Sequence, residues 1–192
     1  MNPEIQGILE QARALTQFSL EDEEVLREAS EALLPLADEV KKVFYDVLFG
    51  YEPTAQVFRS LAQSRVEREA TLKKWYELMV SGTYDDKFWD WQWFVGLVHI
   101  QHHVSHTFMM SMMARVQALL LRKCLELFEE ASAERVFSAL LRLTSCIAIF
   151  MAEGYYQQFL DAIERAGLKK SLVDRLVSME VKEMVQGMRR KF

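Results

Sequence analysis

Hydrophobic residues recur every three or four positions along almost the whole chain, which is the spacing that puts them on one side of an α-helix. One such stripe consists of Val40, Val43, Phe44, Val47 and Leu48. The pattern predicts seven or eight helices and no convincing strand. The expected segments are 4–16, 19–34, 36–49, a brief segment at 54–62, a longer helix ending at residue 80, an aromatic-rich helix from residue 86, two long helices at 105–130 and 132–166, and a last amphipathic helix at 169–190.

Polar and breaking residues fall at the expected helix ends. Ser19 is followed by acidic residues that suit the positive end of a helix dipole, and Asp85 precedes the aromatic-rich helix in the same way. Pro35 separates two helices, because proline removes a backbone donor and clashes with the preceding turn. Gly50 with the following Pro53 is expected to end the helix over 36–49.

Composition supports an all-α protein. The 192 residues are 51% apolar and include only 7 Gly and 3 Pro, which favours long helices over a turn-rich sheet protein. The length suits one domain, here residues 1–168, and the helix at 169–192 either belongs to it or begins a connection. The number of helices exceeds that of a simple four-helix bundle and matches globin-like packing around a pocket, although periodicity alone does not choose between them.

Charge and motifs exclude several classes of function. The formal net charge is −5 and basic residues form no block, so a nucleic-acid partner is not expected. No export signal precedes the first helix, no run reaches the length of a membrane span, and Cys124 and Cys146 have no CxxC spacing. We therefore expect a cytoplasmic protein that binds no membrane. No catalytic triad, phosphate loop or paired-carboxylate motif appears, and no catalytic residue is assigned.

All four histidines lie in one stretch, HIQHHVSHTF at 99–108. On a continuous helix, His102, His103 and His106 would lie at about 300°, 40° and 340° from His99, so that all four share one side. Three interpretations follow. A bare metal could bind His99 with His103, or His102 with His106; the histidines could be half-buried at a helix end or subunit contact; or one of them could be the axial ligand of haem.

Residues upstream favour a haem ligand. The run FVGLVHI surrounds His99 with apolar side chains, as a planar apolar cofactor requires, and Gly96 lies one turn earlier, where a missing side chain permits close approach. Aromatic residues are dense in the same region, among them Trp89, Trp91 and Trp93. The simpler interpretation is that these residues fill the core.

At this point the chain resembles the protoglobin and globin-coupled sensor family. Four segments carry the likeness: VFYDVLF at 43–49, LKKWYELMVSGTYDDKFW at 72–89, FVGLVHI at 94–100, and the pair of long apolar helices after residue 107. Family members have an iron-binding histidine in a Val-Gly-x-x-His setting, which here is Val95, Gly96 and His99. The resemblance covers about residues 20–160 and implies a globin-like fold with an extra N-terminal helix and long C-terminal helices.

The resemblance also implies roles for individual residues. His99 corresponds to the proximal ligand of the iron of haem b, and Tyr45 to the distal tyrosine whose hydroxyl can donate to bound dioxygen. Thr71 and Leu72 fall where family members line the distal side, with the helix phase uncertain by one residue. Candidate pocket walls, each equally explained by core packing, are Phe44, Trp75, Phe94 and Val95, and His103 is a candidate at the haem edge.

One departure from the family concerns the turn after the proximal histidine. Members commonly end that helix with a Gly-Leu-x-Pro-like turn, whereas this chain has His103, Val104, Ser105 and His106. Either Ser105 or Thr107 could cap the next helix in place of the proline. If the helix instead runs on, His99 would tilt or another imidazole would approach the iron or a haem propionate.

The resulting prediction is a haem-binding globin that binds O2, CO or NO at ferrous iron, for gas sensing or gas handling. Dioxygenation of NO or a peroxidase-like side reaction is compatible with it. The apolar surplus of the helices at 107–130 and 132–166 resembles the family's dimerisation pair and predicts a homodimer, with a monomer core as the alternative. The alternative from another class is a non-haem helical bundle that binds zinc or nickel, or an interaction module, through the 99–106 histidines.

Overall fold

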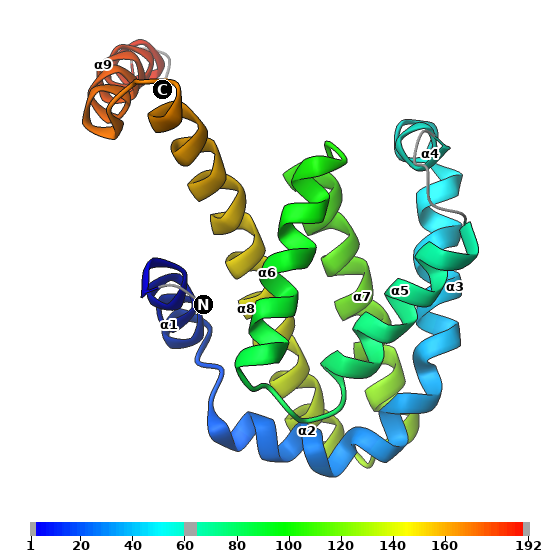
Figure 1. Cartoon of the computed structure of the whole chain (residues 1–192). Coiled ribbons are helices and arrows are strands. Elements are labelled where there is room, and N and C mark those ends of the chain that lie inside the picture. Colours follow the sequence, from blue (N-terminus) through cyan, green and yellow to red (C-terminus); the bar gives the residue numbers. More distant parts are fainter. Residues whose placement is uncertain (1–2, 60–64, 190–192) are drawn as a thin grey trace. The chain divides into compact units, whose positions relative to one another are not determined.

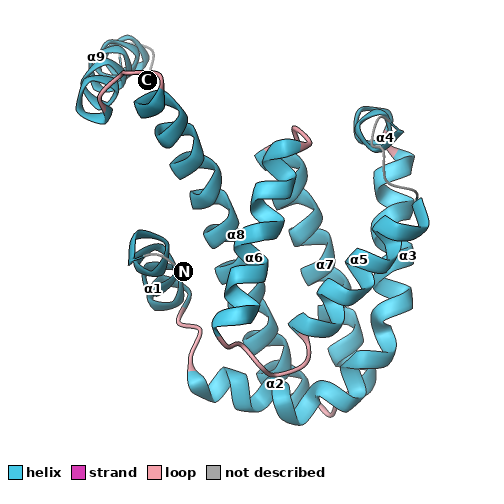
Figure 2. Ribbon diagram, in the orientation of Figure 1, coloured by secondary structure: helices cyan, strands magenta, loops and turns pink. Residues whose placement is uncertain are grey.

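The structure, a computed structural model, describes residues 3–59 and 65–189, which form helices joined by short loops (Figure 2). No strand occurs within those two ranges, so the predicted all-α class is confirmed. The helices are α1 (Pro3–Thr16), α2 (Leu20–Leu33), the 3-10 helix η1 (Leu34–Leu36), α3 (Ala37–Gly50), α4 (Glu52–Arg59), α5 (Arg65–Met79), α6 (Asp86–Gln101), α7 (His106–Leu127), α8 (Glu130–Arg165) and α9 (Lys170–Arg189).

The predicted start signals act as expected. The Ser19 backbone N–H donates to Asp22 Oδ2 at 2.9 Å and the Asp22 N–H donates to Ser19 Oγ at 3.4 Å, a reciprocal capping box that begins α2. Asp85 caps α6 by accepting a 2.9 Å hydrogen bond from the Phe88 N–H. Pro35 lies in η1, which separates α2 from α3.

Pro53 has a different role from the predicted one. The helix α3 ends at Gly50, but Pro53 stands in the first turn of α4, where proline's missing N–H has no helical partner to lose. The brief segment predicted at 54–62 is therefore a helix that begins earlier, at Glu52, and residues 60–62 lie outside the described part of the chain.

The chain divides into two compact units, Met1–Gly154 and Tyr155–Phe192. The division falls inside α8, whereas the boundary predicted at residue 168 follows the end of that helix. The assignment of residues 155–168 to the globin-like domain therefore stays a prediction.

The core of the first unit is built around α8 (Figure 1). The ring of Phe150 lies against Trp89 and Trp93 of α6, with centroids 6.0 and 5.3 Å apart. On another side of α8, Gln117 of α7 donates a 2.9 Å hydrogen bond to Thr144. The fully buried residues in this part of α8 include Leu140, Leu143, Cys146 and Ile147. Burial of this apolar segment holds α6 and α7 together.

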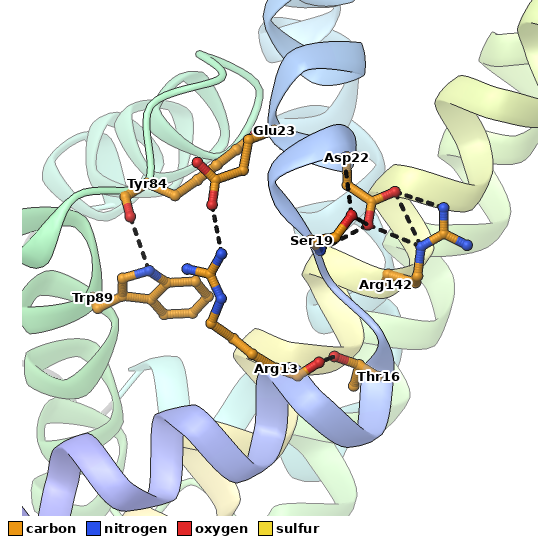
Figure 3. Close-up of polar contacts among 8 residues, drawn as sticks. All are labelled: Arg13, Thr16, Ser19, Asp22, Glu23, Tyr84, Trp89 and Arg142. Atoms are coloured by element: carbon orange, nitrogen blue, oxygen red, sulfur yellow. Dashed lines mark hydrogen bonds and ion pairs between the residues drawn. The ribbon is translucent and has the colours of Figure 1, made fainter.

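An acidic residue links α2 to α8 (Figure 3). Asp22 is 3% exposed, and both of its carboxylate oxygens accept hydrogen bonds from Arg142 Nε at 3.1 Å. Beside it, Arg13 of α1 forms a 2.6 Å ion pair with Glu23 and lies 5.2 Å from the Phe18 ring centroid. Asp22, which forms the capping box with Ser19, thus also fixes α2 to the core helix.

The second unit consists of the end of α8 and the helix α9. The predicted amphipathic helix at 169–190 is present as Lys170–Arg189, with none of its residues buried. Its large apolar side chains that are at least 37% exposed are Leu172, Leu176, Val177, Met179, Val181, Met184, Val185 and Met188.

The helix α8 is long and apolar enough to cross a membrane by length and composition alone. Within its most apolar window, however, 56% of the residues are buried inside the protein. A core helix has the same properties, and the contacts of Phe150 and Thr144 give α8 that position in the first unit.

Removing the Asp22 charge should destabilise the protein in a pH-dependent way. Burial raises the pKa of Asp22, but hydrogen bonds from Arg142 and Ser19 outweigh it and hold the pKa below its ordinary 3.8. A carboxyl with a lowered folded-state pKa contributes stability that is fully present above the unfolded pKa and lost as the pH falls through the folded value. We expect Asp22→Asn to lower the free energy of unfolding by about 1 kcal/mol at neutral pH.

Urea unfolding of both proteins across pH 3–7 measures this difference. The gap between wild type and Asp22→Asn should close in acid. A gap that is equally large at pH 3 would show that the ionic interaction is not its source.

Candidate functional site

His99 lies in the last turns of α6, with a partly buried side chain. Its Nδ1 atom is buried and has no hydrogen-bond partner within the described part of the chain. Burial, together with the nearby His102, lowers the pKa of His99 from 6.5 to about 4. The imidazole is therefore neutral at physiological pH, and a neutral ring with an unsatisfied nitrogen suits a metal ligand.

The turn after His99 ends α6 without a proline. The Val104 N–H donates to the His99 carbonyl and the His103 N–H to the Ile100 carbonyl, both at 3.0 Å, which is the hydrogen-bond pattern of a Schellman motif. His103 stands at the position that glycine usually takes, with φ +54°. Ser105 then caps α7 by accepting from the Phe108 N–H. Of the two predicted caps, Ser105 is the one that the structure uses.

This turn separates the four histidines. His99 belongs to α6, His102 and His103 to the turn, and His106 begins α7, so the continuous helix that would put them on one side does not form. His103 is exposed. Among the described residues, no group of three or more His, Cys, Asp or Glu side chains could hold a metal ion. A bare metal site in this stretch would lack the closed ligand set of a structural zinc site.

The helices α5 and α6 are joined by a tight loop. Gly82 in this loop has φ +73°, and a Cβ there would lie 2.4 Å from the Arg27 Cα of α2, so only glycine fits. Further along, Trp75 Nε1 of α5 donates a 3.0 Å hydrogen bond to Gln92 Oε1 of α6 in the buried interior. The loop and this hydrogen bond hold the C-terminal half of α5 beside the N-terminal half of α6.

Gln92 is a further candidate site residue that the sequence patterns did not single out. It is completely buried, and its Nε2 atom has no hydrogen-bond partner among the described residues. Because it precedes His99 by about two helical turns, the two side chains leave α6 on the same side. A lone amide inside the aromatic run FWDWQWF was the available signal.

Tyr45 of α3 lies in an apolar cluster. It is 4% exposed and packs with Leu48 and Met112, and its ring stacks on Phe49 at a centroid distance of 6.0 Å. Phe44 lies edge-on to it at 5.7 Å. Burial raises the pKa of Tyr45 to about 12, so its hydroxyl stays protonated and able to donate.

The structure distinguishes the two candidates on α5. Leu72 packs against the cluster of Tyr45, Leu48 and Met112. Thr71 is exposed, and its hydroxyl donates to the Glu67 carbonyl within the same helix at 3.0 Å. The Thr71 hydroxyl proton is thus used within α5, and the distal role predicted for Thr71 stays a prediction.

The other predicted wall residues differ in position. Val95 is partly buried and one turn from His99, whereas Phe94 is 51% exposed and lies about 140° around α6 from His99. The Phe94 ring contacts that of Trp91 at a centroid distance of 5.5 Å. The rotation of about 140° directs Phe94 away from the side of α6 that His99 occupies. Gly96 faces Met151 of α8, and a Cβ there would lie 3.7 Å from it, an ordinary van der Waals distance, so the approach of α6 to α8 at this point does not require glycine.

The arrangement has the fold of a globin. The globin domain of the Geobacter sulfurreducens globin-coupled sensor superposes with a TM-score of 0.69 at 19% identity, covering 76% of this chain and 96% of that one. The protoglobin family model matches residues 6–178, and the chain belongs to that family. No curated protein matches the chain. The predicted globin-like fold and family resemblance are both confirmed.

The left-handed conformation of His103 can be tested by substitution. Side chains with a Cβ are disfavoured at φ +54°, so His103→Gly should raise the free energy of unfolding by about 0.5–1 kcal/mol. The matched control is His102→Gly, since His102 has φ −97° and gains nothing from glycine. Thermal unfolding measures both. Equal effects of the two variants would contradict strain at His103.

Proposed function

We propose that this protein binds haem b through His99 and binds a diatomic gas, O2, CO or NO, beside it. The carrying observation is the neutral, partly buried His99 imidazole whose Nδ1 atom lacks a hydrogen-bond partner in the described residues. Histidine is the axial ligand of haem in globins, and family membership supports the same cofactor. When bound, haem supplies an iron atom with an open coordination position for a gas.

The residues around His99 would serve this ligand. The carbonyl of His99 accepts from Val104, which anchors the end of α6 and so limits movement of the imidazole. Apolar surroundings keep the ring neutral, and only a neutral ring has a lone pair to bind iron. Val95, Leu72 and Trp75 would contribute apolar contact to a planar cofactor between α5 and α6.

Tyr45 would act on the bound gas. Its hydroxyl donates at any physiological pH because burial raises its pKa to about 12. A donor of this kind favours a ligand that acquires partial negative charge, as dioxygen does on ferrous iron. We therefore infer that Tyr45 favours O2 over CO, with Phe44 and Leu72 limiting the space around it.

The biological setting follows from the same proposal. We infer a cytoplasmic protein for gas sensing or gas handling, with neither a nucleic acid nor a membrane as partner. No catalytic residue is proposed; dioxygenation of NO or a peroxidase-like reaction would be side activities of the cofactor. His103 is proposed to lie at the edge of the haem, where its exposed ring could meet a propionate.

A homodimer through α7 and α8 is also proposed. Leu121 and Leu125 of α7 are 40% and 61% exposed, and Leu141 of α8 is 39% exposed. Apolar side chains in these helices would be buried in a symmetric contact, in which the same surface of each copy meets itself.

The absorption spectrum of the haem-loaded protein tests the ligand. We expect a Soret band that shifts when CO is added to the reduced protein, and its loss or a strong change in His99→Ala. His106→Ala is the matched control, because it removes an exposed imidazole outside α6 and should leave the spectrum unchanged.

Two results would redirect the proposal. Absence of any haem band in the wild type would refute haem binding, and metal analysis would then test the alternative, a zinc or nickel site among the 99–106 histidines. An unchanged spectrum in His99→Ala would assign the iron to another ligand.

Sedimentation velocity tests the dimer. Leu125→Glu combined with Leu121→Glu should convert a dimer to monomer, since carboxylates in an apolar contact are costly to desolvate. The control is Leu15→Glu in α1, where the leucine is 81% exposed outside the proposed surface. A wild-type monomer at micromolar concentration would rule the dimer out.

A further inference from the structure

The inner side of α5 carries a basic residue. Arg68 precedes Leu72 by about one helical turn and Trp75 by about two, so these three side chains leave α5 on the same side. Leu72 contacts the Tyr45 cluster and Trp75 is bonded to Gln92 of α6. Arg68 therefore lies on the side of α5 that faces both α3 and α6, and its Nε atom is buried.

The charge on Arg68 acts on Tyr45. Burial is the largest influence on the pKa of Tyr45 and raises it; Arg68 is the strongest of the surrounding charges and lowers it. Glu69 and Arg65 act more weakly and with opposite signs. The three charges sum to one positive charge beside a phenol in an apolar cluster.

Arg65 has a different environment from Arg68. Its guanidinium forms a 2.6 Å ion pair with Glu69, and its side chain is 60% exposed. It also lies 5.0 Å from the centroid of the Phe49 ring. Arg65 thus lies at an exposed position one turn from Arg68, and it serves as a comparison for the same charge outside the buried side of α5.

Arg68 and Tyr45 each offer hydrogen-bond donors. The guanidinium remains protonated at all physiological pH and presents several N–H groups in a plane, and the Tyr45 hydroxyl remains an O–H. A neutral diatomic gas needs no cation for binding, whereas an anion gains a charge-assisted hydrogen bond from one.

We propose that Arg68, with Tyr45, makes the distal side of the haem pocket an anion-accepting subsite, which takes small inorganic anions of the fluoride, azide and nitrite class. This inference rests on the proposed haem binding. It assigns Arg68 the role of stabilising negative charge on a ligand held at the open position of the iron.

Anion titration of the oxidised, haem-loaded protein tests the subsite, with fluoride and azide as probes and absorption as the readout. Arg68→Leu should weaken fluoride binding at least about tenfold, as expected for loss of a hydrogen bond to a charged group. Arg68→Lys should retain part of the affinity. CO binding to the reduced protein should change less than about twofold in both variants, because CO is neutral.

Arg65→Leu is the matched control, since it removes the same charge one turn away at an exposed position. Its fluoride affinity should stay within about twofold of the wild type. Equal weakening in Arg65→Leu and Arg68→Leu would overturn the proposal, because it would reduce the effect to the overall charge of α5.

A competing role for Arg68 is an ion pair with a haem propionate. In that case Arg68→Leu would release haem faster to a scavenging apo-globin while fluoride affinity stays unchanged, which would overturn the subsite. If Arg68→Leu does not fold, as judged by circular dichroism, Arg68→Gln replaces it in both measurements. If the wild type takes up no haem, the proposed function is refuted. If the wild type binds haem but the Arg68 variants bind anions as tightly as it does, only this inference is refuted.

Discussion

The buried middle of α8 is the surface on which α2, α6 and α7 of the first unit assemble. The Phe150 ring packs against the indole rings of α6, and Thr144 accepts a hydrogen bond from Gln117 of α7. Arg142 donates hydrogen bonds to Asp22 of α2. Apolar burial supplies most of the free energy, and the Asp22 contact determines where α2 lies. Since α6 carries His99, the position of the proposed iron ligand depends on how α6 packs against this one helix.

The close approach of the α5–α6 loop to α2 depends on one glycine. A Cβ at Gly82 would lie 2.4 Å from the Arg27 Cα of α2. With α5 and α6 held together at Trp75 and Gln92, the side chains of His99 and Leu72 lie beyond that contact, toward the other ends of the two helices. The candidate site therefore lies between α5 and α6, which the hydrogen bond between Trp75 and Gln92 holds together.

Burial prepares the two principal candidate residues for complementary tasks. Loss of solvent disfavours the charged form of either group, so the pKa of His99 falls and that of Tyr45 rises. The imidazole keeps a lone pair for a metal and the phenol keeps a proton to donate. One physical cause thus provides an electron-pair donor on α6 and a hydrogen-bond donor on α3. Arg68 adds a positive charge near Tyr45, which lowers the pKa of the phenol against the effect of burial.

The sequence by itself determined most of the helices and several of their ends, because capping and proline effects act within a few residues: Ser19, Pro35 and Asp85 are the examples. Pro53 is the exception, because it begins α4. It also determined the family, through an ordered set of motifs. Only the tertiary structure decided that Leu72 rather than Thr71 meets Tyr45, since a one-residue change of phase rotates a helix by about 100° and periodicity does not resolve it. The burial of Gln92 likewise depends on contacts between segments, which no local pattern contains.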